Sequence, residues 1–231
     1  MADFIHHLLF GIYPYIALAV LAVGSVIRYD REPYSWRAGS SQLLRRRQLM
    51  IGSVLFHLGV LMIFAGHVVG LLTPIAVWDA LGVSHEAKQI LAMAAGGVAG
   101  VMAILGATLL IHRRFFDPRV RAASGFSDNM VIVLLWLQLV LGLATIPVSA
   151  QHLDGHEMVK FMTWAQSIFT FRAGASDLVR DAAPVFKLHL FLGLTILLLF
   201  PFTRLVHMLS APVRYIWRPG YQVVRSRKLA S

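Results

Sequence analysis

Five long apolar stretches constrain the fold of this 231-residue chain more than any other feature. A helix needs about 20 mainly apolar residues to cross the hydrocarbon core of a bilayer. Backbone groups inside lipid must be hydrogen-bonded within the segment, so we expect each stretch to be a helix. The sequence therefore predicts an all-α integral membrane protein with five transmembrane helices in one bundle. The predicted spans are Phe4–Ile27, Ile51–Pro74, Ala87–Ile111, Met130–Val148 and Phe186–Met208.

The composition excludes an ordinary soluble domain. Apolar residues make up 58% of the chain and charged residues only 14%, whereas about 25% of the residues of soluble proteins are charged. We expect one membrane domain over residues 1–210 and a basic cytoplasmic tail over residues 211–231. The chain has no cysteine, which excludes iron–sulfur ligation and thiolate zinc sites in this chain and leaves histidine as its main candidate metal ligand.

The basic residues predict how the chain crosses the membrane. Sixteen of the 21 basic residues follow the first span, follow the third span, or lie from the end of the fifth span onward. The positive-inside rule then places the N-terminus outside and the C-terminus in the cytoplasm. The net charge of +10 does not indicate nucleic-acid binding, because the basic clusters adjoin apolar spans, where they contact lipid headgroups.

The longest loop, over residues 149–185, contains the amphipathic run MVKFMTWAQSIFTF. A run of this kind is expected either to lie along the outer membrane surface or to cap the end of the bundle. The sequence does not choose between these arrangements.

Apart from His6 and His7 at the start of the first span, four histidines fall inside the predicted spans. His57 and His67 lie in the second span, and His189 and His207 lie in the fifth. Ionisable residues are costly inside a membrane and usually have a function there. These four residues are therefore the main candidates for the functional site.

The two spans run in opposite directions, which predicts how the histidines pair. Antiparallel packing places His57 beside His207 near the cytoplasmic face and His67 beside His189 near the outer face. Two imidazole pairs at two depths are what two bis-histidine b-type haems require. The alternative is that the histidines hydrogen-bond across helices or relay protons.

The spacing along the two spans is unequal. His57 and His67 are about 15 Å apart along an ideal helix, whereas His189 and His207 are about 27 Å apart. The sequence therefore predicts that the fifth span is bent or strongly tilted, with Pro201 as the candidate kink.

Two haems at different depths would conduct electrons across the bilayer, and quinol is the expected lipid-soluble donor on the outer side. Its site should lie near His67 and His189. Gly66 could allow a ring to approach closely, or could serve ordinary helix packing. Lys88 could donate to a quinone oxygen, or could extend to the headgroups. Arg113, Arg114 and Arg204 are candidate partners for haem propionates, although topology signalling explains them equally well.

The sequence resembles the gamma subunit, the cytochrome b membrane anchor, of respiratory membrane-bound nitrate reductases. The resemblance covers nearly the whole chain. It is carried by the runs DFIHHLLFGIYPYIALAVLAVGSVIRYD, SWRAGSSQ, FHLGVLMIFAGHVVGLLTP, EAKQ, FDPRVRA, LATIPVSAQHLDGHEM and KLHLFLGLTILLLFPFTRLVH.

The resemblance implies a multi-pass protein of the bacterial inner membrane that holds two haem b groups and oxidises menaquinol or ubiquinol. It implies an iron–sulfur beta subunit and a molybdenum alpha subunit on the cytoplasmic face. It assigns His67 and His189 to one haem, and His57 and His207 to the other. It also places Lys88 and Gly66 in the quinol site.

Three alternatives remain at this stage. The chain could be the di-haem anchor of another oxidoreductase, such as a hydrogenase or a formate dehydrogenase. It could be a transporter that uses the histidines as a proton relay, or a haem-free structural anchor. The last two alternatives predict that the purified protein has no haem absorbance.

Overall fold

The computed structural model describes residues 1–32 and 44–209, and within these ranges the chain is helical and has no β-strand. Five helical segments there are long and apolar enough to cross a membrane, which confirms the predicted architecture. The tail predicted over residues 211–231 lies outside the described residues. The five segments are Ala2–Arg31, Arg46–Leu72, His85–Phe116, Phe126–Ser149 and Pro184–Phe202.

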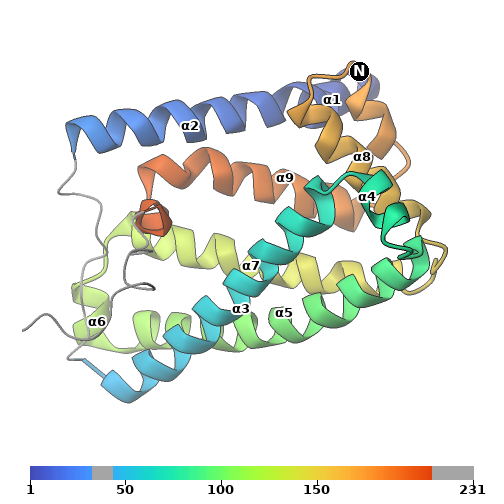
Figure 1. Cartoon of the computed structure of the whole chain (residues 1–231). Helices are drawn as coiled ribbons and strands as arrows, with labels where there is room; N and C mark the ends of the chain where they lie inside the picture. Colours follow the sequence, from blue (N-terminus) through green and yellow to red (C-terminus); the bar gives the residue numbers. More distant parts are fainter. Residues whose placement is uncertain (33–43, 210–231) are drawn as a thin grey trace, which may run out of the picture.

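Shorter helices join and extend these segments (Figure 1). The first segment contains a π-helical turn, and the last ends in a 3₁₀ helix that a second 3₁₀ helix follows. In chain order the elements are α1 (Ala2–His7), η1 (Leu8–Ile12), α2 (Tyr13–Arg31), α3 (Arg46–Leu72), α4 (Ile75–Ala80), α5 (His85–Phe116), α6 (Pro118–Ala122), α7 (Phe126–Ser149), α8 (His156–Phe169), η3 (Ala175–Val179), α9 (Pro184–Leu199), η4 (Phe200–Phe202) and η5 (Arg204–Met208).

The long helices lie side by side in the order α3, α5, α7, α9 and α2 (Figure 1). Helix α3 packs most extensively on α5, while α9 packs between α7 and α2. In the described part of the chain, α3 and α9 make few backbone contacts with each other. The two helices that carry histidines are thus held in place mainly by other neighbours.

Small residues bring α3 and α5 close together. A Cβ atom added to Gly59 would lie 2.7 Å from both the Ala99 oxygen and the Ala103 nitrogen. A Cβ atom on Gly106 would lie 2.3 Å from the Phe56 nitrogen. Membrane helices associate through this kind of close backbone approach. The crossing fixes the position of α3 around His57, between Phe56 and Gly59.

A tryptophan stabilises the irregular turn in the first span. Pro14 has no N–H, so the Phe10 carbonyl four residues earlier lacks its usual helical donor. The Trp164 Nε1 group on α8 donates to this carbonyl at 2.9 Å. An unpaired carbonyl inside the membrane would be costly, and this bond removes that cost.

Helix α8 covers one end of the bundle. The Gln166 side chain donates to the Leu71 and Thr73 carbonyls at 3.0 and 3.1 Å, at the C-terminus of α3. Met162 and Ile168 on the same helix are buried. The amphipathic run of the loop over residues 149–185 therefore caps the end of the bundle, which is one of the two arrangements predicted for it.

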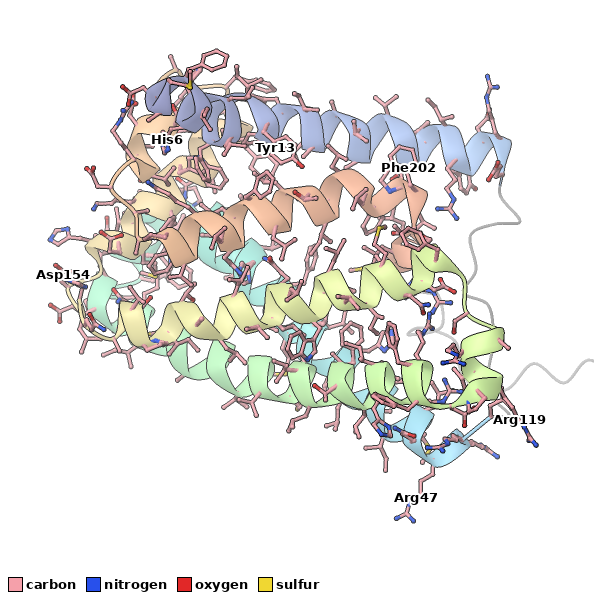
Figure 2. The ribbon with its side chains drawn as sticks, turned by 180° about the vertical axis from the view of Figure 1, so that it is seen from behind. His6, Tyr13, Arg47, Arg119, Asp154 and Phe202 are labelled. Atoms are coloured by element: carbon pink, nitrogen blue, oxygen red, sulfur yellow. The ribbon has the colours of Figure 1, made fainter. Side chains whose placement is uncertain are left out.

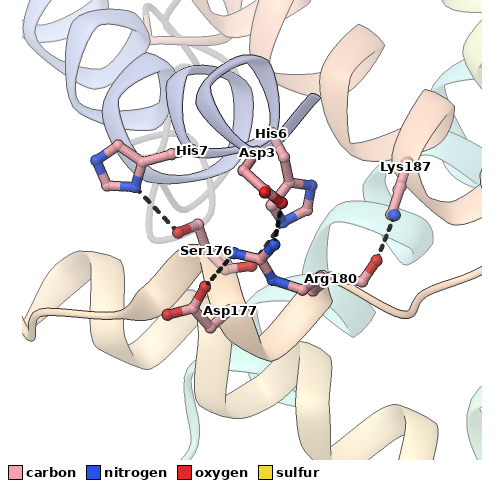
Figure 3. A network of polar contacts seen from close by, with 7 residues as sticks. All are labelled: Asp3, His6, His7, Ser176, Asp177, Arg180 and Lys187. Atoms are coloured by element: carbon pink, nitrogen blue, oxygen red, sulfur yellow. Dashed lines mark hydrogen bonds and ion pairs between the residues drawn. The ribbon is translucent and has the colours of Figure 1, made fainter. Parts of the chain in front are cut away.

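A polar network fastens the N-terminal helix to the same end of the bundle (Figure 3). Arg180 pairs with Asp3 and also with Asp177, the latter at 2.9 Å, and its hydrogen bond lowers the pKa of Asp177. Three further bonds complete the network: His6 Nε2 with the Ser176 carbonyl at 2.8 Å, His7 Nδ1 with the Ser176 hydroxyl at 3.1 Å, and Lys187 Nζ with the Arg180 carbonyl at 2.5 Å.

The two ends of the bundle differ in charge. Arg47 and Arg119 lie at one end, and Asp154 and His6 lie at the other (Figure 2). We call the end with Arg47 and Arg119 the basic end. This asymmetry agrees with the distribution of basic residues in the sequence, whereas the direction of the bundle across the membrane stays a prediction.

Candidate functional site

The structure brings the four histidines together in two pairs. His57 on α3 faces His207 on η5, with ring centroids 6.1 Å apart and ring planes at 70°. His67 on α3 faces His189 on α9, with centroids 6.2 Å apart and planes at 41°. Residues far apart in the sequence thus meet at two levels of the bundle.

The distances match two imidazoles on opposite sides of one metal ion. A bond from a metal to an imidazole nitrogen is about 2.0 Å long, and the ring centroid lies roughly 1.1 Å behind that nitrogen, so the two centroids should be about 6.2 Å apart. The observed separations are 6.1 and 6.2 Å. The spacing of both pairs therefore suits axial ligation of a haem iron.

Hydrogen bonds fix the tautomer of three of the histidines. The Nδ1 atoms of His57 and His67 lie 2.8 Å from the Ser53 and Ile63 carbonyls, respectively. The His207 Nδ1 atom lies 2.5 Å from the Arg204 carbonyl. A carbonyl only accepts, so each Nδ1 carries the proton and each Nε2 keeps its lone pair for a metal.

His189 has a different environment. Its Nδ1 atom has no hydrogen-bond partner among the described residues. The Gln138 amide nitrogen on α7 donates to the His189 carbonyl at 3.1 Å and lies 3.5 Å from its Nε2 atom. A Cβ atom on Gly142 would lie 3.0 Å from His189 Cε1, so α7 supports the edge of this ring.

The fifth predicted span is wrong at its C-terminal end. Helix α9 stops at Leu199, and His207 lies on the separate helix η5 rather than on the spanning helix. Pro201 has no N–H to continue the α-helix, and Thr203 is extended, with φ −121° and ψ 178°. The predicted irregularity at Pro201 is therefore present, as a break in the α-helix rather than a bend. The mismatch of about 12 Å between the two histidine spacings was calculated for continuous α-helices. Because His189 and His207 do not lie on one continuous helix, that calculation does not apply to them.

The donor set is suited to haem rather than to a metal ion held by protein ligands alone. Within the described residues, no group of three or more His, Cys, Asp or Glu side chains could hold a metal ion. A haem brings four nitrogen ligands of its own and needs only two axial ligands from the protein. Each histidine pair supplies two. The role of the four histidines as haem ligands remains a prediction.

Lys88 is buried and points into the protein, which contradicts the alternative that it extends to the headgroups. Its residue is 5% exposed. The ammonium donates to the Gly70 carbonyl at 3.0 Å and to the Met162 sulfur at 2.8 Å. It also lies 4.4 Å from the centroid of the Trp78 ring, within the range of a cation–π interaction.

These contacts place Lys88 beside His67. Gly70 follows His67 by three residues on α3, which is about 4.5 Å along the helix axis. A lysine ammonium has three donors, and the two hydrogen-bond partners in the described structure leave one for another acceptor. Lys88 can therefore present a fixed cationic donor near the His67–His189 pair.

Gly66 does not serve helix packing in the described part of the protein. A Cβ atom on Gly66 or on Gly70 would have no neighbour within 4 Å. The two glycines are four residues apart and share one face of α3. This smooth face adjoins the carbonyl that holds Lys88, and a flat ring could approach it closely.

The three candidate propionate partners already have partners in the protein. Arg113 donates to the Leu44 carbonyl at 2.7 Å. The Asp128 carboxylate lies 2.8 Å from Arg204 and 3.7 Å from Arg114. These contacts give the arginines a structural role at the basic end, and their binding to propionates stays a prediction.

Several residues that support the site were not predicted from the sequence. Gln138 could have been noticed as a polar residue in the middle of an apolar span, since such residues usually bond across helices. Trp78, Met162, Arg28 and Asp128 give no comparable signal, because they lie in loops or at span ends, where polar and aromatic residues are common.

Comparison with known proteins identifies the family. The chain matches the family described as "Nitrate reductase gamma subunit" over residues 6–227. It is 51% identical to the respiratory nitrate reductase 1 gamma chain of Escherichia coli (strain K12) over 225 residues, which cover 97% of this chain and 99% of the relative.

Two further relatives agree. Identity is 50% over 228 residues with the respiratory nitrate reductase 2 gamma chain of the same strain, covering 99% of this chain and 100% of that one. It is 38% over 223 residues with the nitrate reductase gamma chain of Bacillus subtilis (strain 168), covering 95% and 98%. The chain belongs to the family of nitrate reductase gamma subunits.

Proposed function

We propose that this protein is the membrane di-haem cytochrome b subunit of a quinol-oxidising nitrate reductase. In this proposal, His67 and His189 hold one haem b and His57 and His207 hold the other. Electrons from quinol pass along the bundle to iron–sulfur and molybdenum subunits on the cytoplasmic face, where nitrate is reduced to nitrite. The protein would reside in the bacterial inner membrane as a multi-pass subunit.

The observation that carries the proposal is the geometry of the two histidine pairs. Their centroid separations of 6.1 and 6.2 Å suit a metal between the rings. The Nδ1 bonds of His57, His67 and His207 orient Nε2 of these residues for ligation. When bound, a haem with two imidazole ligands supplies one-electron transfer without an open coordination site.

The residues around Lys88 support a quinol site at the end of the bundle away from the basic end. Oxidation of one quinol to quinone releases two electrons and two protons. Lys88 would donate a hydrogen bond to one oxygen of the ring, and the face formed by Gly66 and Gly70 would admit the ring beside His67. With this end outside, the protons would be released outside while the electrons move inward.

The basic end supports the proposed docking of the partner subunits. Arg47 and Arg119 lie there (Figure 2). With the N-terminus outside, the positive-inside rule makes this end cytoplasmic. An electron acceptor docked there would face the second haem.

The family favours this proposal over the alternatives. A hydrogenase or formate dehydrogenase anchor would share the chemistry, but the chain matches gamma subunits of nitrate reductases along almost its whole length. A proton relay or a haem-free anchor gives no reason for two ring pairs that both have the separation of bis-imidazole ligation.

The test is to follow haem absorbance in membranes that contain the assembled complex. A menaquinol analogue is expected to reduce the b-type absorbance, and nitrate is then expected to reoxidise it. If the quinol analogue leaves the absorbance unchanged, the quinol-oxidising role is contradicted. If reduced haem persists after nitrate is added, the link to nitrate reduction is contradicted.

A further inference from the structure

The chain that carries His207 leaves the α-helical form inside the bundle. Helix α9 ends at Leu199, η4 covers Phe200–Phe202, and Thr203 is extended before η5 begins. Carbonyls at such a break lose their helical donors, and leaving them unpaired inside a membrane protein is costly. The break therefore needs other groups to hold it.

Arg28 on α2 supplies donors at this point. Its Nη1 atom donates to the Pro201 carbonyl at 2.6 Å and to the Thr203 carbonyl at 2.7 Å. The Thr203 hydroxyl accepts from the Leu205 amide at 3.3 Å and caps η5. Helix α2 thus donates to the carbonyls on both sides of Phe202, where the chain turns.

An ion pair holds the next residue. Asp128 lies in the first turn of α7, and its carboxylate is 2.8 Å from the Arg204 Nε atom. Arg204 is the first residue of η5. Both side chains are mostly shielded, at 26% and 21% exposure, so solvent screens this pair less than a surface ion pair.

Arg204 links the ion pair to the histidine. Its side chain meets Asp128, and its backbone carbonyl accepts the Nδ1 proton of His207 at 2.5 Å. Val206, next to His207, is 0% exposed and packs in a core cluster with Val131 and Ile196. The ring of His207 is therefore oriented by a residue that α7 holds in place.

We infer that Asp128 and Arg28 are positioning residues that hold η5 so that His207 faces His57. This inference rests on the proposed function, because it assigns the two residues to one of the two haems. Groups that orient a metal-binding histidine typically change metal affinity about 10- to 100-fold when removed. The His67–His189 pair is built differently, since His189 lies on the continuous helix α9 and needs no support at a helix break.

The test compares Asp128→Asn, Arg204→Gln and the double variant in the full chain in membranes. The readouts are haem content per chain and the electron paramagnetic resonance signal and midpoint potential of each low-spin haem. We expect the affinity for the haem at His57–His207 to fall about 10- to 100-fold and its resonance signal to shift. The haem at His67–His189 stays unchanged and serves as the internal reference.

The double variant shows whether the two residues act together. If Asp128 and Arg204 form one positioning unit, the effect of the double variant should be close to that of either single variant. Asp117→Asn is the matched control. It removes another carboxylate at the basic end, one that pairs with Arg45 at 2.7 Å and caps α6, and it should leave both haem signals unchanged.

The two single variants also separate positioning from simple charge effects. Charge alone predicts that Asp128→Asn and Arg204→Gln shift the midpoint potential of the nearby haem in opposite directions, with occupancy and resonance signal intact. That result would overturn the inference, and so would unchanged occupancy and signal in both variants. A direct propionate bond cannot explain an effect of Asp128→Asn, because two carboxylates do not pair.

Arg28→Gln tests the other half of the clamp and should also disturb the haem at His57–His207 alone. Unchanged signals there would remove Arg28 from the inference. If Asp128→Asn loses both haems, Asp128→Glu decides, because it keeps the carboxylate. Recovery of the haem at His57–His207 supports the inference, and equal loss contradicts it. An unmodified chain without b haem would instead contradict the proposed function.

Discussion

The two histidine pairs share one helix but are built in different ways. His57 and His67 both lie on α3, and both donate Nδ1 to a carbonyl four residues earlier. Their partners differ. His189 lies on the regular helix α9, with Gln138 beside it, whereas His207 follows a break and lies on η5.

The difference shows how one chain can place two similar pairs on helices whose histidine spacings do not match. One side of the site is a regular helix whose two ligands are ten positions apart in the sequence. The other side reaches the same two levels with ligands eighteen positions apart, because the chain stops being α-helical between them. The break in turn requires polar contacts that hold it, and these come from Arg28, Thr203 and Asp128.

The largest expected effect comes from removing a ligand. His67→Ala or His189→Ala should remove one b haem, and His57→Ala or His207→Ala should remove the other, because an iron with one axial ligand missing is no longer held between two imidazoles. The measurement is the reduced-minus-oxidised spectrum with haem quantified per chain. If all four variants keep the spectrum of the unmodified protein, neither pair binds haem.

Lys88→Ala should distinguish the two histidine pairs, because it should affect quinol binding beside the His67–His189 pair and leave the His57–His207 pair unchanged. A hydrogen bond from a charged donor contributes about 1.5–3 kcal/mol, so affinity for a quinol analogue should fall about 10- to 100-fold. This affinity is measured by adding increasing amounts of the analogue and following how far it inhibits the reduction of haem by quinol. Lys160→Ala is the control, because that lysine pairs with Glu157 at the same end. Equal affinity in both variants removes Lys88 from the site.

Gly59→Leu tests whether α3 supports both pairs equally. The added side chain would meet Ala99 and Ala103 on α5, and overpacking of this kind costs about 1–3 kcal/mol. We expect lower thermal stability in detergent and weaker retention of both haems. Gly96→Leu is the control, since a Cβ atom there has no neighbour within 4 Å. Loss of one haem alone would show that the crossing supports only one pair.

The smallest effect is expected from Gln138→Leu. A neutral hydrogen bond contributes about 0.5–1.5 kcal/mol, so retention of the haem at His67–His189 should weaken roughly 2- to 10-fold. The other haem should not change. Thr145→Val is a control on the same helix, because the Thr145 hydroxyl donates to the carbonyl of Gly142 within α7 itself. A change at both haems would mean that Gln138 supports the bundle in general.

The five-helix architecture could be predicted because the membrane forces each long apolar stretch to satisfy its own backbone. Irregular turns were harder to predict. The role of Pro14 depends on a distant donor, Trp164, and the end of α9 depends on Arg28 from another helix. Such contacts join residues far apart in the sequence, and periodicity does not report them.

The candidate site followed the same rule. The membrane makes histidine costly, so the four histidines stood out, and the directions of the helices predicted which ones meet. The environment of Lys88 could not be predicted, because a lysine near a span end can extend to water or turn inward. Packing against Met162 and Trp78 from two other helices determines which occurs.

The most direct test of two haem-binding pairs is a redox-difference spectrum of the purified chain with haem quantified per polypeptide. Two pairs with nearly equal ring separations predict two b-type haems per chain, each low-spin with two imidazole ligands. A preparation of folded protein that binds one haem, or none, would contradict the account.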